Sequence, residues 1–588
     1  MNELSELNDA QREAVTTLAG PTLIVAGPGT GKTKTLTTRI VWLIRHEAVV
    51  PQEVVALTFT NKAAREIRER LKKFLPTAEP LPLVTTFHAL GADLLKRRGE
   101  LKPLVSEERR NDIIRSVHKP ASLSTISTRE LGLFISRAKT APAGVVDIHT
   151  RTLLKRYDTI LASESLLDFD DLLVKVLELL RTSNSKRPIY TYILVDEFQD
   201  TSGLQYEFLK LLGAHGNIFA IGDPNQSIYA FRGAGADMFE RFHEDFPETR
   251  EVHLTLNYRS SPEIVKAANA VFPLAPQLEP SKIGPGSVRV IRTLNEYSEA
   301  AYILDQVERG IGGSTMLKAR ERQTILEPRD FAVLYRTRRA GRKVQRAFEE
   351  AGLPYQVAGE GSPYERPDVQ AVIALMHYID RPSESLKRTL LRLPGLKYPS
   401  PRQLNALLVK LPRSDGLTVC ELAERIGALT APSMEHNLQQ LLGTLVQFGA
   451  CDSGLALCLK YLDSLQESEF YDPSVNAVTL MTIHAAKGLE FNSVFLCAAE
   501  EGILPKIIKS EETNMPEERR MFYVALTRAK ESLEILYTTT RDNTESRLSH
   551  FVEEIPDNIL PRTVDPEMAR LKKRAEKQRY KRAQSSLF

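Results

Sequence analysis

The feature that most constrains the fold is a glycine-rich run, Ala26-Gly-Pro-Gly-Thr-Gly-Lys32-Thr33, between an apolar stretch and a helical one. Thr22-Leu-Ile-Val25 before it fits a buried strand, and the residues from Lys34 to Ile44 repeat apolar side chains at helical spacing. A strand, a tight turn and a helix N-terminus in this order present backbone N–H groups to an anion. The run therefore predicts a phosphate loop for a nucleoside triphosphate, formed by Ala26, Gly27, Pro28, Gly29, Thr30, Gly31, Lys32 and Thr33. Lys32 adds a point charge and Thr33 a hydroxyl for Mg²⁺; a turn that binds nothing is the alternative.

Composition places this loop in a chain of several globular domains. The 588 residues are 42% hydrophobic and 26% charged. The sequence contains no run of 18 apolar residues, so we expect no membrane span. The first eight residues lack the basic and apolar regions of a signal peptide. The four cysteines show no paired metal-ligand spacing, which favours a reduced cytoplasm over a disulfide framework. We therefore expect a cytoplasmic protein.

Two sets of short apolar stretches predict an α/β fold with two parallel-sheet lobes, each carrying a mainly helical insertion. The first set of strands is Thr22–Ala26, Val54–Thr58, Leu83–Thr86, Tyr190–Val195 and Ile218–Ile221. The second is Val288–Ile291, Phe331–Tyr335, Tyr355–Ala358, Val478–Thr482, Val494–Cys497 and Leu533–Tyr537. The expected boundaries are 1–86 with 190–270 for the first lobe, 87–189 for its insertion, 271–380 with 475–556 for the second lobe, 381–474 for its insertion and 557–588 for a basic tail.

Adjacent carboxylates, Asp196 and Glu197, end the predicted strand at 190–195. Ligands of a parallel sheet lie beyond the carboxyl ends of its strands, so both acids should lie near the phosphate loop. There Asp196 would hold Mg²⁺ and Glu197 would orient and deprotonate the attacking water. A solvated acidic strand end is the alternative.

Segments along most of the chain resemble, in order, the motifs of superfamily 1A DNA helicases of the UvrD/Rep/PcrA type, here in a short form. The matching segments are Leu7–Val15, Leu57–Ala64, Thr85–Leu90, Ile221–Ala234, Leu256–Ser260, Val478–Phe491 and Glu518–Lys530, besides the phosphate loop and the two carboxylates. The resemblance implies two RecA-like lobes, the cofactors ATP and Mg²⁺, and a bacterial, nucleoid-associated setting.

The same resemblance assigns roles around the nucleotide. Arg259 and Arg528 would contact the γ-phosphate, and Gln226 would sense it. Tyr258 would stack on the adenine, Gln11 would read its edge and Glu490 would contact the sugar. Lys34 stands where many members have an arginine over the adenine, and lysine stacks less well. Gln11 with Asn8 also fits a helix capping box, and both roles can hold.

The resemblance also predicts the single-strand contacts. Phe59, Tyr229 and Phe231 would stack on bases, although packing in the core is the usual role of such side chains. The expected backbone contacts are Thr60, Asn61, His88, Arg232 and His484. A metal-binding role for the two histidines has little support, because no second ligand is spaced nearby.

Two features concern partners. The insertion at 381–474 is short, and the family's duplex-contacting Gly-Ile-Gly turn is missing near Pro394–Ser400. We expect single-stranded DNA and single-strand/duplex junctions as partners, with strand-stimulated hydrolysis and poor duplex unwinding by a monomer. The last five residues resemble the peptide that bacterial partners insert into the replication sliding clamp, with Gln584, Leu587 and Phe588 as contacts; a plain basic tail is the alternative.

The preferred interpretation is an ATP-dependent 3′-to-5′ DNA helicase or translocase on single strands, in repair or replication restart. One alternative is a translocase that strips proteins from single strands without unwinding. A helicase–nuclease subunit is disfavoured, because the chain leaves no spare domain for a nuclease. A nucleic-acid binding module without hydrolysis is disfavoured by an intact set of hydrolytic residues: Lys32, Asp196, Glu197, Gln226, Arg259 and Arg528.

Overall fold

The structure is a computed structural model that forms two compact units, residues 1–309 with 488–588 (unit 1) and residues 310–487 (unit 2). It describes residues 3–17, 19–75, 80–105, 107–117, 128–140, 148–182, 189–230, 233, 235, 237–312, 326–358, 367–380, 382, 386–387, 390–391, 400–411, 417–430, 455, 459, 471–507 and 513–565. Each unit is described by itself below.

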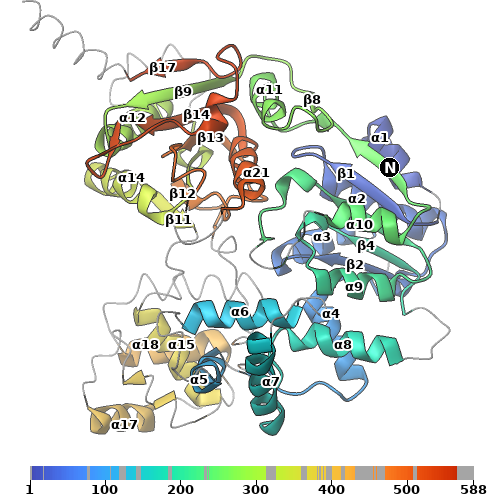
Figure 1. The fold of residues 1–588 in the computed structure, drawn as a ribbon. Coiled ribbons are helices and arrows are strands. Elements are labelled where there is room, and N and C mark those ends of the chain that lie inside the picture. Colours follow the sequence, from blue (N-terminus) through green and yellow to red (C-terminus); the bar gives the residue numbers. More distant parts are fainter. Residues whose placement is uncertain are drawn as a thin grey trace, which may run out of the picture. The chain divides into compact units, whose positions relative to one another are not determined.

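Unit 1 begins with a six-stranded parallel sheet in the order β3-β2-β4-β5-β1-β6 (Figure 1). Its strands are β1 (Thr22–Ala26), β2 (Val54–Thr58), β3 (Leu83–Thr86), β4 (Tyr192–Val195), β5 (Ile218–Gly222) and β6 (Arg250–Leu254). All pairs are parallel, so the carboxyl ends of neighbouring strands β4, β5 and β1 meet at one edge. The residues that follow these three strands are therefore brought together.

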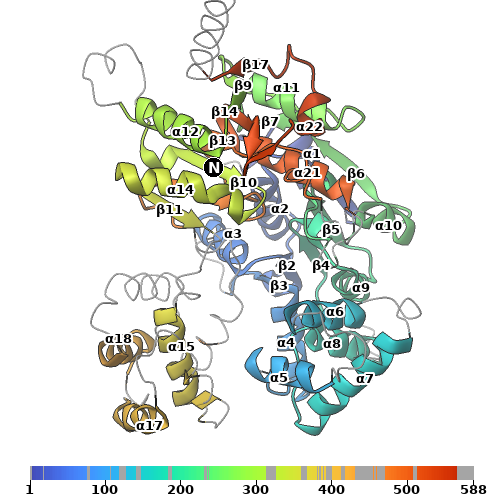
Figure 2. The same ribbon diagram turned by 60° about the vertical axis from the view of Figure 1, so that its left-hand side comes forward.

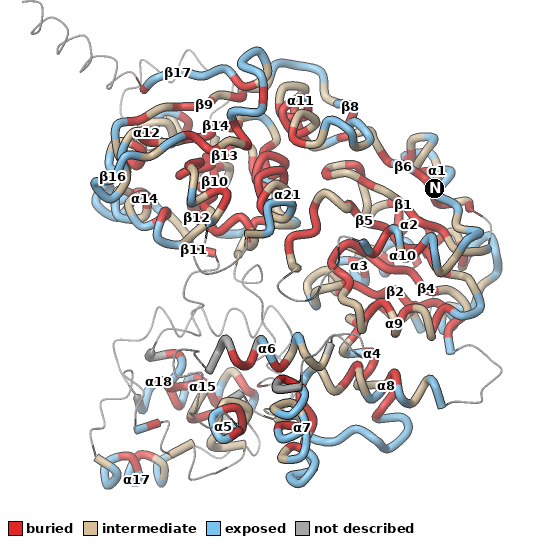
Figure 3. The backbone as a smooth tube through the Cα atoms, viewed as in Figure 1, coloured by how far each residue is buried: buried red, intermediate tan, exposed pale blue. Residues whose placement is uncertain are grey.

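Both faces of this sheet are buried, as the red strands in Figure 3 show. Neighbouring residues Leu23 and Ile24 point into different cores, as the two-residue period of a strand requires. One core includes side chains of α1 (Asp9–Thr16), α2 (Lys32–His46) and α3 (Asn61–Phe74). The other includes α4 (Phe87–Arg97), α8 (Asp171–Thr182), α9 (Gly203–Leu212) and α10 (Met238–Asp245).

The stretch between β3 and β4 is helical, as predicted. Besides α4 and α8 it holds α5 (Glu107–Val117), α6 (Thr128–Thr140) and α7 (Ile148–Ser163), which pack together in a small core of their own (Figure 2). Lys139 on α6 is paired there with Asp168, just before α8, at 2.8 Å and with Asp171, the first residue of α8, at 2.6 Å.

The rest of unit 1 carries four parallel strands in the order β13-β14-β9-β17. They are β9 (Ser287–Thr293), β13 (Phe491–Leu496), β14 (Ala529–Thr538) and β17 (Arg562–Val564). Helix α11 (Pro262–Val271) packs on β9, β14 and α21 (Met515–Leu526), while α12 (Glu296–Gly310) follows β9. Short elements complete this part: β7 (Leu256–Asn257), β8 (Glu279–Pro280), β15 (Thr540–Arg541), β16 (Thr544–Glu545) and α22 (His550–Glu553).

Unit 2 contains three parallel strands in the order β11-β12-β10. They are β10 (Phe331–Tyr335), β11 (Tyr355–Ala358) and β12 (Val478–Thr482), and α14 (Arg338–Ala351) packs on β10 and β12. Helices α15 (Pro367–Asp380), α17 (Pro401–Lys410) and α18 (Val419–Thr430) share a separate apolar core.

The predicted α/β class with two RecA-like parallel sheets is confirmed, and every predicted strand is present to within a few residues. The prediction omitted β6 and β17, because β6 (Arg-Glu-Val-His-Leu) is a charged edge strand with little apolar signal. Among the described residues, no helix is long and apolar enough to cross a membrane. Cys497 is a buried free thiol, whereas Cys420 takes part in a disulfide that the cysteine spacing did not predict.

Candidate nucleotide and nucleic-acid sites

The phosphate loop connects β1 to α2, as predicted. Gly29 and Gly31 have φ angles of +71° and +86°, which non-glycine residues rarely adopt, and Gly31 directly precedes the first residue of α2, Lys32. The Thr30 hydroxyl donates to the Gly27 carbonyl at 2.7 Å, and Lys32 Nζ lies 3.4 Å from the Ala26 carbonyl. These hydrogen bonds within the turn fix its conformation, and the turn leaves the amino end of α2 open to bind an anion.

A second loop, at β7, is fastened to the phosphate loop by Asn257. The buried Asn257 side chain donates to the Pro28 carbonyl at 2.7 Å and accepts from the backbone N–H of Arg259 at 2.9 Å and of Ser260 at 2.8 Å. The backbone N–H of Tyr258 donates to the Gly29 carbonyl at 2.9 Å. A Cβ atom on Gly29 would lie 2.6 Å from the Arg259 Cβ, so only glycine allows this approach. Asn257 was not predicted as a site residue, because its only signal in the sequence is its place beside Tyr258 and Arg259.

Gln11 forms the predicted capping box and also contacts the phosphate loop. It completes the capping box of α1 with Asn8, and its Nε2 donates to the Thr30 carbonyl at 2.8 Å. Asn8 Nδ2 also donates to the hydroxyl of the half-exposed Tyr258 at 2.9 Å. Lys34 turns toward the N-terminal segment, where its Nζ lies 3.2 Å from a Glu6 carboxylate oxygen. These contacts bring the predicted adenine residues beside the phosphate loop.

The two carboxylates lie directly after β4, at the same sheet edge. Asp196 is buried, and its Oδ1 accepts from the backbone N–H of Glu197 at 3.0 Å. Burial, together with the neighbouring charge of Glu197, raises the pKa of Asp196 above its ordinary value. Glu197 has a left-handed backbone (φ 49°), a strained conformation that turns its side chain into the pocket, and Gln199 Nε2 donates to it at 2.5 Å.

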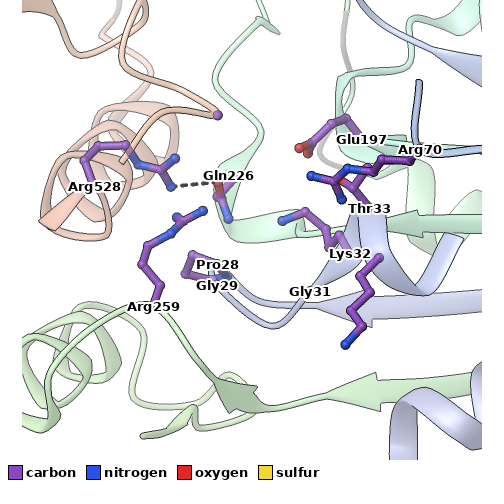
Figure 4. Close-up of a pocket in the computed structure, with 12 residues that line it drawn as sticks. Pro28, Gly29, Gly31, Lys32, Thr33, Arg70, Glu197, Gln226, Arg259 and Arg528 are labelled. Atoms are coloured by element: carbon purple, nitrogen blue, oxygen red, sulfur yellow. Dashed lines mark hydrogen bonds between the residues drawn. The ribbon is translucent and has the colours of Figure 1, made fainter. Parts of the chain in front are cut away.

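Gln226 and Arg528 are joined across 302 residues of sequence. Arg528 Nη2 donates to Gln226 Oε1 at 3.2 Å (Figure 4). Gln226 Nε2 in turn donates to Asp223 Oδ2 at 2.7 Å. The Arg528 guanidinium also donates to the carbonyls of Val524 and Leu489. Burial, and secondarily the charge of Arg259, lower the pKa of Arg528 to about 9. A buried cation beside another cation favours an incoming anion.

Glu490 holds Arg259 from the other side. Its carboxylate lies 2.6 Å from Arg259 Nε and 2.8 Å from Lys530 Nζ. Burial alone would raise the pKa of Glu490, but the two cations outweigh it and the pKa is lowered. Glu490 therefore stays ionised as the counter-ion of Arg259.

Residues of the phosphate loop line one cavity of about 210 Å³ in unit 1, together with Glu197, Gln226, Arg259 and Arg528 (Figure 4). Five of its side chains are cationic and one is a carboxylate: Lys32, Lys34, Arg70, Arg259, Arg528 and Glu197. Such a lining suits a polyphosphate. Arg70, which sequence analysis missed, comes from α3 and extends over the part of the pocket where Glu197 and Thr33 lie. Its guanidinium is paired with Glu66 at 2.6 Å, one helical turn earlier.

The residues expected to hold Mg²⁺ fit that ion by their chemistry. The Thr33 hydroxyl and the buried Asp196 carboxylate are hard oxygen donors, which Mg²⁺ prefers. No group of three or more histidine, cysteine or acidic side chains arranged for a metal occurs in the described part of the chain. Mg²⁺ would therefore take most of its ligands from nucleotide phosphates and water.

The predicted strand-contacting residues of the first lobe gather around the ends of β2, β3 and β5. The rings of Phe59 and Tyr229 stack at 5.4 Å with an interplanar angle of 18°. The Thr60 hydroxyl caps α3 by accepting from Ala63 N–H at 3.1 Å, and Asn61 is exposed at the start of that helix. His484 follows β12 in unit 2 and is half-buried. Phe231 and Arg232 lie outside the described residues, as do Gln584, Leu587, Phe588 and most of the segment Pro394–Ser400.

A further aromatic residue, Phe169, accompanies His88. The two rings stack at 4.0 Å and 21°, and 52% of Phe169 is exposed just before α8. Burial lowers the pKa of His88 to about 4, so this ring is uncharged at neutral pH. Phe169 was not predicted, because residues 87–189 were interpreted from the sequence only as a helical insertion.

Comparison with protein-family models identifies both halves of the chain. Residues 7–247 match the UvrD/REP helicase N-terminal domain, and residues 252–442 and 422–540 match the UvrD-like helicase C-terminal domain. The chain belongs to the UvrD/Rep helicase family.

Relatives across the full length agree. The UvrD/Rep family member described here is 31% identical to the ATP-dependent DNA helicase PcrA of Leuconostoc citreum, over 94% of this chain and 85% of the relative. It is 30% identical to the protein of the same name from Bacillus subtilis (strain 168), over 95% and 86% of the two chains. The corresponding protein of Staphylococcus aureus (strain Mu50) is 28% identical over 95% and 87%.

Proposed function

We propose that this chain is an ATP-dependent DNA helicase that moves along single-stranded DNA in the 3′-to-5′ direction, in repair or replication restart. The observation that carries the proposal is the cationic pocket around the phosphate loop, with Glu197 as its one carboxylate. The names of its PcrA relatives support the use of ATP and DNA. The direction and the pathway rest on the family resemblance.

In this proposal the residues of the pocket divide the work of hydrolysis. The phosphate loop and Lys32 would hold the phosphates. Thr33 and Asp196 would hold Mg²⁺, which would supply positive charge to neutralise the phosphate oxygens. Glu197 accepts a proton from the attacking water. Arg259 and Arg528 stabilise charge on the γ-phosphate, so Arg259 exchanges its Glu490 partner for phosphate oxygens.

Gln226 is the proposed link between hydrolysis and the strand. It lies on the short helix after β5, three residues before Tyr229, and its side chain bridges Asp223 and Arg528. A change at the γ-phosphate that moves Arg528 would pull on this segment. Tyr229 stacks with Phe59, so the movement reaches a proposed base-stacking pair.

The central experiment is ATP hydrolysis with and without single-stranded DNA. Glu197→Gln should lower kcat by about 10²–10⁴-fold while leaving nucleotide binding intact, because it removes only the base. Glu13→Gln, an exposed partner of Arg250 in the same unit, is the control and should retain wild-type activity. Wild-type hydrolysis that does not respond to single strands would contradict the proposed motor.

The protein-stripping translocase is a second candidate, favoured by the short insertion at 381–474. Strand separation on 3′-tailed, 5′-tailed and forked duplexes, with and without clamp, would distinguish the two. We expect poor unwinding by the monomer and release of a protein blocked on a 3′-tailed single strand. Efficient monomeric unwinding of a long tailed duplex would reject this candidate.

We also propose clamp binding through Gln584, Leu587 and Phe588. A terminal Leu-Phe pair behind a basic tail suits insertion into an apolar pocket. Deleting residues 584–588 should abolish recovery of the chain on immobilised sliding clamp. Unchanged recovery would contradict the proposal.

A further inference from the structure

Lys530 is a cation beside the nucleotide cavity that does not line it. It is the second residue of β14, two residues after Arg528, and it is absent from the lining of the cavity. Its Nζ lies 2.8 Å from one carboxylate oxygen of Glu490, whose other oxygen lies 2.6 Å from Arg259 Nε. One carboxylate therefore holds two cations, of which only Arg259 lines the cavity.

The backbone around Lys530 is fastened to the loop that carries Arg259. The backbone N–H of Ser261 donates to the Lys530 carbonyl at 2.8 Å, and the Ser260 hydroxyl donates to the Ala529 carbonyl at 2.7 Å. Both serines are buried, so these hydrogen bonds are shielded from water. The two cations thus start from joined segments, which keep both side chains within reach of the shared carboxylate.

The proposed hydrolysis requires this shared arrangement to change. Arg259 must leave Glu490 before it can contact the γ-phosphate. The Glu490 side chain is only 43% exposed, and burial by itself raises its pKa, so a partly buried carboxylate would lose a counter-ion at that step. Lys530 remains as the second counter-ion. It also competes with Arg259 for the same carboxylate, which weakens the resting ion pair.

We propose that Lys530 is a positioning residue that keeps Glu490 paired and so allows Arg259 to move to the γ-phosphate. The step exchanges ion pairs and forms no covalent bond. Lys530 acts through Glu490 and Arg259 and does not itself line the cavity. The inference rests on the proposed function, in which Arg259 contacts the γ-phosphate. The alternative is that Lys530 only orients Glu490 toward the sugar, which ADP and ATP share.

The test compares Lys530→Met with the wild-type protein in nucleotide binding without DNA. Methionine keeps an unbranched side chain and removes the charge. Binding of ADP and of a non-hydrolysable ATP analogue is measured by competition with a fluorescent nucleotide in the presence of Mg²⁺. Affinity for the ATP analogue should fall by about 5-fold, which corresponds to about 1 kcal/mol for one partly exposed ion pair. Affinity for ADP should stay unchanged, because ADP has no γ-phosphate.

Two further variants separate positioning from a structural role. Lys530→Arg keeps the cation and should retain wild-type affinity for both nucleotides. In a Glu490→Gln background there is no carboxylate to share, so adding Lys530→Met should change the affinity for the ATP analogue by less than about 2-fold. A structural role would give the same loss in both backgrounds, and that result would overturn the inference.

The matched control is Lys282→Met. Lys282 pairs with Glu531, the residue after Lys530, and its side chain is 34% exposed against 31% for Lys530. This control should bind both nucleotides as the wild-type protein does. Equal losses of ADP and ATP-analogue affinity in Lys530→Met would overturn the inference, as would wild-type affinity for both or the same loss in the control. Wild-type hydrolysis without strand stimulation would contradict the proposed function, whereas binding without DNA would still test Lys530.

Discussion

Asn257→Ala should slow hydrolysis by releasing Arg259, although Asn257 itself need not touch nucleotide. Its side chain makes three hydrogen bonds, of 2.7, 2.9 and 2.8 Å, to Pro28, Arg259 and Ser260. At about 1 kcal/mol net for each bond, the substitution should lower the free energy of unfolding by about 3 kcal/mol. A displacement of the Arg259 guanidinium by about 1 Å should lower kcat by about 100-fold, or about 2.7 kcal/mol.

A double-mutant cycle separates the loss of Arg259 positioning from a general loss of folding. Strand-stimulated ATP hydrolysis is measured for Asn257→Ala, Arg259→Ala and the double variant at saturating ATP and DNA. If Asn257 acts through Arg259, adding Asn257→Ala to Arg259→Ala should change kcat by less than about 3-fold. An equal loss in both backgrounds would refute the reasoning, as would a wild-type kcat for Asn257→Ala.

Asn295→Ala is the matched control for lost stability. Asn295 Oδ1 accepts from the backbone N–H of Tyr297 at 3.1 Å and of Ser298 at 3.0 Å, at the start of α12. The substitution should lower the midpoint of thermal unfolding without affecting kcat, because no lining residue of the pocket comes from this helix.

Three further predictions concern a glycine, an aromatic residue and an acid. Gly29→Ala should abolish nucleotide binding, measured by fluorescent-nucleotide titration. Gly99→Ala is the control: Gly99 has a similar φ of +73°, but a Cβ atom added there would have no atom within 4 Å, so this variant should only lose stability. Phe169→Ala should weaken single-strand binding by about 1–3 kcal/mol in anisotropy titrations, while Phe134→Ala, equally exposed on α6, should have no effect. Burial raises the pKa of Asp170 to about 6, so its contribution to stability should fall as pH rises from about 4 to 6. Asp170→Asn should flatten this part of the pH–stability curve, and an unaltered curve would contradict the assignment.

Local sequence patterns predicted most of the fold, because the backbone conformation and burial of most segments depend on their own residues. The phosphate loop needs left-handed backbone at Gly29 and Gly31, and only glycine adopts it without strain. Buried strands such as Thr22–Ala26 are apolar on both faces, so they stand out from their surroundings. The charged edge strand β6 was missed because its pairing with β1 is decided by a partner over 200 residues away.

The sequence by itself determined the chemistry of the nucleotide site: a phosphate loop, a pair of carboxylates after a strand, and the family motifs that nominate Gln226, Arg259 and Arg528. Only the tertiary structure decided which groups hold one another. It joined Arg528 to Gln226, gave Arg259 the counter-ion Glu490 and the anchor Asn257, and brought Arg70 of α3 into the cavity. The physical reason is that a hydrogen bond or ion pair between distant residues leaves no local periodicity in the chain, and exists only once the parallel strands have brought their carboxyl ends together.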